Sequence, residues 1–355
     1  MSGRSKTQKS NVSEDERRRI PGYKILGKVG TGAMAVVYKA VQLSLDRIVA
    51  IKLLPKRFSE NPEYLERFYR EGRAAAKLNH PNIVQAIDVG EAGGCHYFVM
   101  EYVEGKTIAD DISAGNVFGE EDALKIIIQV ARALKHAHDH GVIHRDVKPK
   151  NIMISNTGQV KLADLGLARE VTDTKAAQFE AGKAYGTPYY ISPEQIRGMV
   201  DLDGRADIYS LGAAFYHMVT GQVPFSDENN IEIMRKHLRE RIVPPDHINT
   251  SLSQGVGEVI EVMMAKNREN RYNDVDELLI DLELLLQGDP PLHARKKFDV
   301  KELQTLENGE LLEEDARIQE IRTQYRSIIL TMVAILGISV LLNIILILSL
   351  VWRTQ

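Results

Sequence analysis

The stretch HRDVKPKNIM, residues 144–153, places five ionisable side chains in its first seven positions and follows them with an amide. Asp146, when ionised, only accepts hydrogen bonds, so it can orient a hydroxyl substrate and take up its proton. Lys148 can bring positive charge to a phosphoryl group in transfer, and Asn151 carries an oxygen of the kind that Mg²⁺ prefers. The alternative is a solvated loop of mixed charge, but the spacing of these groups favours a phosphoryl-transfer site.

A second acidic motif, ADLG at 163–166, ends the apolar strand predicted over residues 159–164. Mg²⁺ is usually held by one or two protein oxygens together with the phosphates of its substrate. We therefore expect Asn151 and Asp164, on neighbouring loops, to share one metal ion.

A turn of mostly small residues, from Gly30 to Ala35, separates two predicted strands near the N-terminus. Such a turn lets backbone N–H groups approach phosphate oxygens, although small-residue hairpins without this role are also common. Because a strand follows the turn and not a helix, the pattern disfavours a Rossmann or Walker phosphate site.

Lys52 ends the apolar stretch VAIK, where a lysine either snorkels from a sheet edge or faces a charged partner. Glu71, on the helix predicted over residues 61–78, is the candidate partner. It could instead form a surface pair with Arg67, one helical turn earlier. The local sequence leaves both interpretations open.

Hydrophobic periodicity predicts an α+β fold with two lobes. Short β-branched segments dominate residues 23–100, whereas helices dominate after residue 104. The strongest helix pattern covers residues 120–139, where apolar side chains recur on one face. We expect an N-lobe at 21–103, a C-lobe at 104–288 and a ligand cleft between them.

Taken together, these motifs resemble the signature of the protein kinase family. In chain order they are GTGAMAVVYKA, VAIK, Glu71, HRDVKPKN, DLG, GTPYYISPE at 186–194, DIYSLG at 207–212 and Arg271. Lys148 and Thr187 resemble the Ser/Thr class. A kinase domain followed by one apolar span is similar to bacterial transmembrane Ser/Thr kinases, whose best-known members carry extracellular PASTA repeats that this sequence lacks.

The resemblance implies ATP- and Mg²⁺-dependent phosphorylation of Ser and Thr hydroxyls on proteins. The catalytic residues it implies are Asp146, Lys148, Lys52 and Glu71, with Asn151 and Asp164 as metal ligands. The nucleotide-binding residues it implies are Val29, Gly30, Thr31, Gly32, Ala33, Met34, Ala35, Val37, Ala50, Lys52, Glu101, Val103 and Met153, with Met100 as gatekeeper. It also implies a structural ion pair between Glu194 and Arg271 and a brace of the catalytic loop by Asp207.

Regulation is expected at the activation loop, residues 164–194. In kinases similar to this chain, an arginine at the position of Arg145 binds a phosphate on this loop, and Thr172 and Thr174 are the candidate phosphosites. The alternative is an unmodified loop. Three positions depart from the family pattern: Ala35 replaces a glycine, Leu165 a phenylalanine and Ser192 an alanine, and we expect each change to be tolerated.

Composition and the chain ends complete the prediction. A net charge of −4 argues against a nucleic-acid partner, and the single cysteine, Cys95, excludes an intramolecular disulfide. Residues 1–20 predict a disordered basic arm. Residues 289–326 predict a juxtamembrane stalk, either a short coiled coil or a solvated helix, the irregular apolar spacing favouring the latter.

Residues 327–352 carry no charged side chain. As a helix this segment would span ~39 Å, enough to cross a ~30 Å hydrocarbon core, whereas a buried core helix rarely runs so long without charge. Three arginines lie shortly before it, so the positive-inside rule places the preceding region in the cytoplasm and the C-terminus outside the cell membrane. A homodimer is compatible with the sequence but not indicated by it.

Two function classes are compatible with these observations. One is an active membrane-tethered Ser/Thr kinase that phosphorylates its own activation loop. The other is a membrane-anchored pseudokinase scaffold, a class that usually lacks the lysine, the catalytic aspartate or the metal-binding aspartate. All of these residues occur here, so the sequence favours the enzyme.

Overall fold

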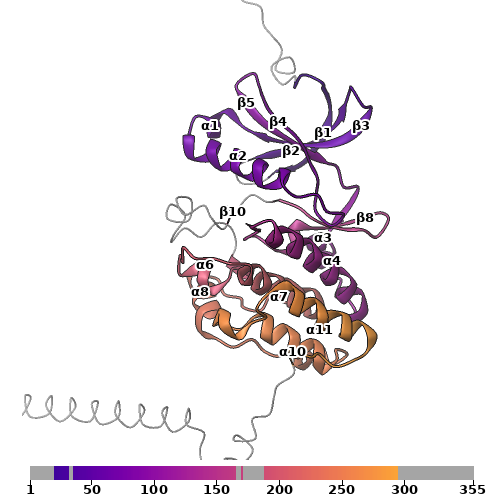
Figure 1. Cartoon of the computed structure of the whole chain (residues 1–355), viewed down its shortest axis with the longest axis vertical. Coiled ribbons are helices and arrows are strands. Elements are labelled where there is room, and N and C mark those ends of the chain that lie inside the picture. The colour runs from indigo at the N-terminus through magenta and orange to yellow at the C-terminus, as the bar shows by residue number, and fades with distance from the viewer. Residues whose placement is uncertain (1–19, 32–34, 165–168, 171–187, 295–355) are drawn as a thin grey trace, which may run out of the picture. The chain divides into compact units, whose positions relative to one another are not determined.

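The computed structural model describes residues 20–31, 35–164, 169–170 and 188–294, all of which belong to one compact unit. Figure 1 shows a lobe built on a β-sheet joined to a lobe built from helices, as the two-lobed α+β prediction requires. Predictions for residues 1–19 of the basic arm, the turn residues 32–34, the activation-loop threonines, residues 295–326 of the stalk and the apolar segment 327–352 lie outside the described residues. Within the described ranges, no helix is both long and apolar enough to cross a bilayer.

The N-lobe contains a five-stranded antiparallel sheet in the order β1-β2-β3-β5-β4. Its strands are β1 (Tyr23–Thr31), β2 (Val36–Gln42), β3 (Arg47–Leu54), β4 (Ala86–Ala92) and β5 (Cys95–Glu101). Gly93 and Gly94 form the two-residue turn between β4 and β5 with φ values of 59° and 75°, which glycine adopts without strain.

Strand β4 begins at Ala86, although the β-type sequence IVQAIDVGE already starts at residue 83. The segment before it pairs with the C-lobe instead: Val84 N–H donates to the Leu162 carbonyl at 3.0 Å, and Leu162 N–H to the Asn82 carbonyl at 2.8 Å. The β-type pattern was therefore correct, but the first residues of the stretch pair with the other lobe.

Two helices, α1 (Lys56–Ser59) and α2 (Pro62–Ala76), accompany the sheet (Figure 1). Helix α2 ends two residues before the predicted boundary at residue 78. Lys77 and Leu78 N–H groups bond to carbonyls three residues earlier, which tightens the last turn into 3₁₀ geometry.

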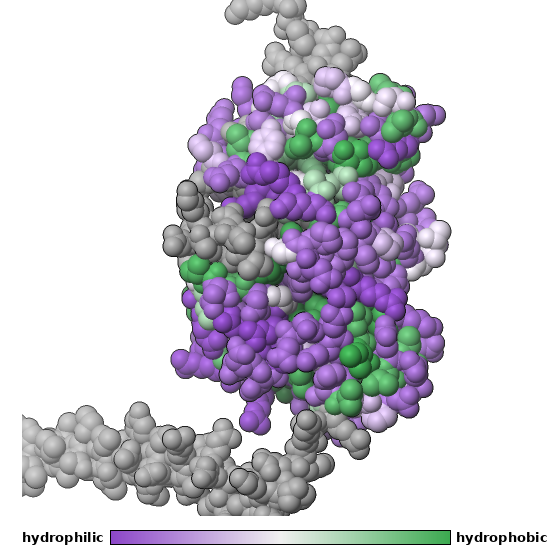
Figure 2. Space-filling model, viewed as in Figure 1, coloured by the Kyte–Doolittle hydropathy of each residue, from purple (hydrophilic) through white to green (hydrophobic). Residues whose placement is uncertain are grey.

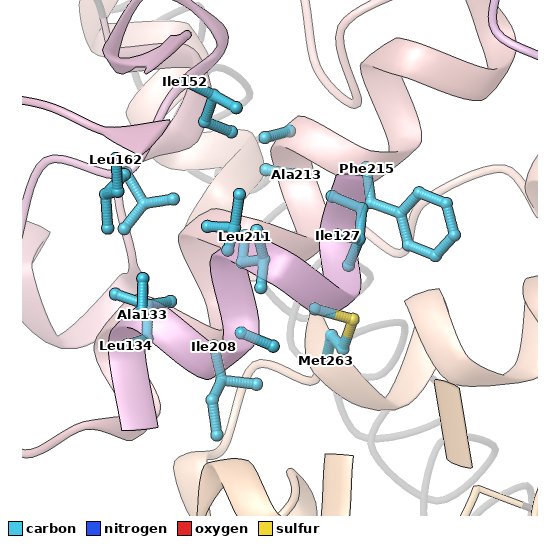
Figure 3. Packing of buried hydrophobic residues seen from close by; sticks show 14 of the residues in the cluster. Ile127, Ala133, Leu134, Ile152, Leu162, Ile208, Leu211, Ala213, Phe215 and Met263 are labelled. Atoms are coloured by element: carbon cyan, nitrogen blue, oxygen red, sulfur yellow. The ribbon is translucent and has the colours of Figure 1, made fainter. Parts of the chain in front are cut away.

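The C-lobe is built around two long helices, α4 (Glu120–Asp139) and α7 (Arg205–Thr220). In α7 every residue but Arg205 and His217 is buried, as expected for a helix packed on all sides. Figure 3 shows apolar side chains of both helices meeting those of neighbouring elements. Among the described residues, the other helices of this lobe are α3 (Ile108–Ser113), α6 (Pro193–Ile196), α8 (Asn230–Arg239), α9 (Pro245–Ile248), α10 (Gln254–Met263) and α11 (Val275–Gln287).

The C-lobe also contains short strands and 3₁₀ turns. The strands β6 (Gly105–Thr107), β8 (Ile152–Ser155) and β9 (Val160–Leu162) form one small sheet, and β7 (Val142–Ile143) pairs with β10 (Arg169–Glu170). The 3₁₀ turns are η2 (Pro149–Asn151), η3 (Pro188–Tyr190) and η4 (Arg268–Asn270). Strand β7 directly precedes the stretch 144–153, and η2 and β8 form its C-terminal end.

The compact lobe continues past the predicted boundary at residue 288. The buried carboxylate of Asp281 on α11 accepts hydrogen bonds from the N–H groups of Leu292, His293 and Ala294 at 2.7–3.1 Å. The Tyr272 hydroxyl donates to the same carboxylate at 2.8 Å. The segment after α11 is therefore fastened to the C-lobe as far as Ala294. On the face shown in Figure 2, hydrophilic residues predominate and hydrophobic ones form small separate groups.

Candidate active site

Lys52, Glu71 and Asp164 come from three different elements and meet at one point. Strand β3 positions Lys52, helix α2 positions Glu71, and Asp164 follows β9. Lys52 Nζ lies 2.5 Å from Glu71 Oε1 and 2.8 Å from Asp164 Oδ1. Glu71 is 8% exposed, so it belongs to this cluster and is not a surface group.

Burial and charge fix the protonation of this cluster. Burial disfavours the charged form of Lys52, but Glu71 and Asp164 outweigh this effect and raise the pKa of Lys52. The Asp164 side chain is partly enclosed, which opposes its ionisation, yet Lys52 holds the pKa of this carboxyl below its ordinary value. Burial raises the pKa of Glu71 to about 7, although Lys52 opposes the rise. At neutral pH the cluster therefore presents a cationic Lys52 and an anionic Asp164.

The catalytic-loop candidates Asp146, Lys148 and Asn151 also lie together. Lys148 Nζ lies 2.7 Å from Asp146 Oδ2. Asn151 Nδ2 donates to the Asp146 carbonyl at 2.9 Å and to Asp146 Oδ2 at 3.2 Å. Since its nitrogen is engaged in this way, Asn151 directs its amide oxygen elsewhere, as a metal ligand would require.

Backbone contacts join this loop to the end of β9. Ala163 N–H donates to the Asn151 carbonyl at 2.8 Å, which brings Asn151 next to the residue preceding Asp164. The Asp164 side chain is 46% exposed. Asn151 and Asp164 thus offer two hard oxygen donors on adjacent loops, a set that fits Mg²⁺ bound jointly with substrate phosphates.

Two residues of the site hold left-handed backbone conformations that non-glycine residues rarely adopt. Arg145 has φ 65° and Asp164 has φ 62°. Asp207 on α7 holds the first of these: its carboxylate accepts from the N–H of Arg145 at 2.7 Å and of His144 at 2.8 Å. Such strain is maintained only where surrounding contacts over-determine it.

Comparison with known proteins identifies this arrangement. The sequence profile described as "protein kinase domain" matches residues 23–281. The chain belongs to the protein kinase family. A probable serine/threonine-protein kinase of Clostridium perfringens, CPE1738, is 42% identical over 275 residues, which are 78% of this chain and 40% of that protein. The serine/threonine-protein kinase PknB of Mycobacterium tuberculosis is 40% identical over 271 residues, 75% of this chain and 43% of that protein.

A solved structure agrees with these relatives. The kinase domain of Mycobacterium tuberculosis PknI, crystallised as a double mutant, superposes with a TM-score of 0.60 at 27% identity, covering 75% of this chain and 96% of that one. The chain spans less than half the length of the curated relatives described above.

The adenine-binding candidates of the kinase fold lie on β2, β3 and β8, at the end of β5 and in the segment directly after it. Ala50 on β3 pairs with Met100 on β5, and Val37 on β2 pairs with Lys52. Glu101 N–H donates to the Gln85 carbonyl at 2.9 Å, so an adenine contact at this residue has to use the Glu101 carbonyl.

The phosphate-covering turn of the kinase is described on both sides of its tip. Gly30 pairs with Val37 across β1 and β2, and the ladder shifts register between Lys28 and Gly30. Val29 is 50% exposed and Ala35 is 8% exposed. The tip, residues 32–34, lies outside the described part of the chain, as do Thr172 and Thr174.

Two kinase residues near the site were not predicted from the sequence. Lys161 on β9 lies 2.8 Å from Glu101 Oε2 and so links the C-lobe to the segment that would bind adenine. Gln195 on α6 donates from Nε2 to the Arg145 carbonyl at 2.9 Å. A signal for Gln195 existed: Ser192-x-x-Gln195 matches the capping-box pattern, and the structure contains that box.

The ion pair expected of the kinase fold is present and buried. Arg271 Nη1 and Nη2 lie 2.6 and 2.8 Å from the two oxygens of Glu194, and the two side chains are 0% and 3% exposed. Glu194 directly precedes Gln195, so this pair helps to fix the start of α6.

Proposed function

We propose that the chain transfers the γ-phosphoryl group of ATP to Ser and Thr hydroxyls of proteins. The observation that carries this proposal is the meeting of Lys52 with Glu71 and Asp164 beside a loop on which Lys148 and Asn151 both contact Asp146. A cation for the nucleotide phosphates, a base for the hydroxyl and oxygen ligands for a metal are thus all available. Relatives that carry the name serine/threonine-protein kinase support the class of acceptor.

In this reaction the substrate oxygen bonds to the γ-phosphorus, the bond to the β–γ bridging oxygen breaks, and ADP leaves. Asp146 orients the hydroxyl and receives its proton. Lys148, 2.7 Å from Asp146, supplies positive charge where the transferring group develops negative charge. Lys52 holds the α and β phosphates. Asn151 and Asp164 would hold Mg²⁺, which neutralises phosphate charge when bound.

The discriminating experiment replaces Asp146 by asparagine. We expect Asp146→Asn to lower kcat by roughly 10²–10⁴-fold, because positioned proton acceptors typically contribute that much. The matched control is Lys150→Ala, which removes a charge from an exposed position of the same loop and should change kcat less than about twofold. Transfer from ATP to a generic protein substrate and to the chain itself is measured with and without Mg²⁺. Undiminished transfer by Asp146→Asn would refute the assigned role, and no transfer by the wild type would favour the pseudokinase scaffold.

We also propose that residues 327–352 anchor the chain in the cell membrane with the kinase domain in the cytoplasm. Support comes from the uncharged length of the segment and the arginines before it. Fractionation of cells that express the full chain or a chain ending at residue 326 tests this: equal recovery of both in the soluble fraction would contradict it.

Activation by phosphorylation is the third part of the proposal. A phosphate on Thr172 or Thr174 adds nearly two negative charges and would order the loop against Arg145. One chain would transfer this phosphate to another, either within a homodimer or between separate molecules. Intact-mass and peptide mass spectrometry, before and after incubation with ATP, tests it. Active enzyme without phosphate at either threonine contradicts this part alone.

A further inference from the structure

The peptide between Arg145 and Asp146 is the connection on which the position of the proposed base depends. Arg145 holds φ at 65°, in the left-handed region that β-carbon-bearing residues avoid. Without restraint the chain would favour another conformation here, and Asp146 would move with it. The contacts that hold this peptide therefore bear directly on catalysis.

Hydrogen bonds hold Arg145 on both of its backbone groups. Its N–H donates to Asp207 Oδ1 at 2.7 Å, which the kinase resemblance anticipated. Its carbonyl accepts from Gln195 Nε2 at 2.9 Å, which nothing in the sequence analysis assigned. This carbonyl shares a peptide plane with the N–H of Asp146, so Gln195 acts on the plane that leads into the base.

The amide of Gln195 is itself held in one orientation. Its Oε1 accepts from Ser192 N–H at 3.1 Å and from Ser192 Oγ at 3.0 Å. A backbone N–H can only donate, so the oxygen of the amide has to face Ser192 and the nitrogen has to face Arg145. Ser192 is fully buried, so water has no access to these bonds from the serine side.

We propose that Gln195 is a positioning residue for Asp146, acting through the Arg145 carbonyl, and that the backbone N–H of Ser192 keeps the Gln195 amide in its orientation. The inference deepens the proposed kinase function and rests on it. It also assigns a role to Ser192, which replaces the alanine of the family pattern: the serine hydroxyl and the glutamine amide form one reciprocal unit. Asp207 and Gln195 hold the same residue from α7 and α6.

The test compares Gln195→Met with Gln254→Met in the full-length chain. Methionine keeps the length of the side chain and removes the amide. Gln254 lies on the exposed face of α10, where its amide contacts only Glu258 among the described residues. We expect Gln195→Met to lower kcat about tenfold, the scale of one hydrogen bond. KM for ATP should stay within about twofold, because the residue acts on the base and not on the nucleotide site. Gln254→Met should match the wild type in both constants.

Two further measurements separate positioning from plain stability. Ser192→Ala removes the cap hydroxyl but leaves its N–H to orient Gln195, so its Tm should fall at least as much as that of Gln195→Met, with kcat within about threefold of wild type. Amide hydrogen exchange in the peptide covering residues 144–148 should accelerate in Gln195→Met and not in Gln254→Met. If Gln195→Met proves too unstable to purify, Gln195→Asn, which is one methylene too short to span both partners, replaces it.

The outcomes distinguish this inference from the proposed function. Unchanged kcat and unchanged exchange in the Gln195 variants, with Asp146→Asn inactive, overturn the positioning role and leave the kinase assignment intact. If kcat falls in proportion to Tm in both Ser192→Ala and Gln195→Met, the positioning role is also overturned, because loss of stability alone then explains the effect. If the wild type transfers no phosphate, the kinase proposal fails, and unaltered exchange in Gln195→Met then shows that Gln195 does not hold the loop either.

Discussion

The buried pair of Arg271 and Glu194 gives the sharpest stability prediction, through the substitution Arg271→Met. Arg271 makes two hydrogen bonds of 2.6 and 2.8 Å to Glu194 and donates to the carbonyls of Ala265 and Arg205 at 2.8 and 2.9 Å. The arginine lies over the Tyr209 ring at 4.8 Å. Methionine fills part of the space but leaves an uncompensated carboxylate in a dry site.

The magnitude follows from this geometry. Removing one partner of a buried pair typically costs about 3–5 kcal/mol, because the stranded charge must stay unpaired or take up a proton. The two carbonyls lose donors as well, which places Arg271→Met near the upper end of this range. With total stabilities of about 5–15 kcal/mol, such a loss would lower Tm by roughly 10–20 °C.

The assay is thermal and denaturant unfolding of the purified chain, with two companion variants. Arg271→Lys keeps the charge but cannot form the bidentate contact, so its loss of stability should be intermediate. The double variant Glu194→Gln, Arg271→Met no longer strands a charge, so it should be more stable than Arg271→Met alone. A loss below about 1 kcal/mol in Arg271→Met, or strictly additive effects in the double variant, would refute the reasoning.

Two further predictions concern Glu71 in the candidate active site and Asp281 near the end of the C-lobe. Because burial raises the pKa of Glu71 to about 7, the ionised form that pairs with Lys52 predominates only above that pH. Activity should therefore rise with pH between about 6 and 8. Glu71→Gln should be less active and should lose this rise in its kcat/KM profile. If the rise is unchanged in this variant, a group other than Glu71 causes it. Asp281→Asn replaces one acceptor oxygen by a donor facing the N–H groups of Leu292, His293 and Ala294. Asp281→Asn should destabilise the domain by about 1–3 kcal/mol and speed proteolysis after α11. Equal cleavage rates in the variant and the wild type would show that Asp281 does not fasten this segment.

Much of the site could be predicted because the relevant patterns are local. Lys52 follows three apolar strand residues, and Asp146, Lys148 and Asn151 lie within six positions of one another, so motif and spacing were enough. The contact from Gln195 to the Arg145 carbonyl joins residues 50 positions apart, and no local periodicity encodes it. The same holds for Lys161 and Glu101, 60 positions apart. The start of β4 could not be predicted for a related reason: a β-type sequence pattern does not show which lobe its residues will pair with.

Three carboxylates of the helical lobe, each at most 3% exposed, share one structural role: each fastens a segment that apolar packing alone would not place. Asp207 accepts the N–H groups of the catalytic loop, Glu194 receives Arg271 at the start of α6, and Asp281 accepts the segment after α11. Hydrophobic burial is not directional, whereas a carboxylate that accepts several short hydrogen bonds fixes both distance and angle.

The cost of burying these charges is offset only while every partner is in place. Burial alone would raise the pKa of Asp207, but its bonds with His138 and the N–H of His144 hold that pKa below the ordinary value. His144 and Arg145, which directly precede Asp146, are therefore held by the ionised carboxylate of Asp207 on α7. Because α7 itself is packed on all sides, displacement of the proposed base requires either breaking these bonds or moving the core of the lobe.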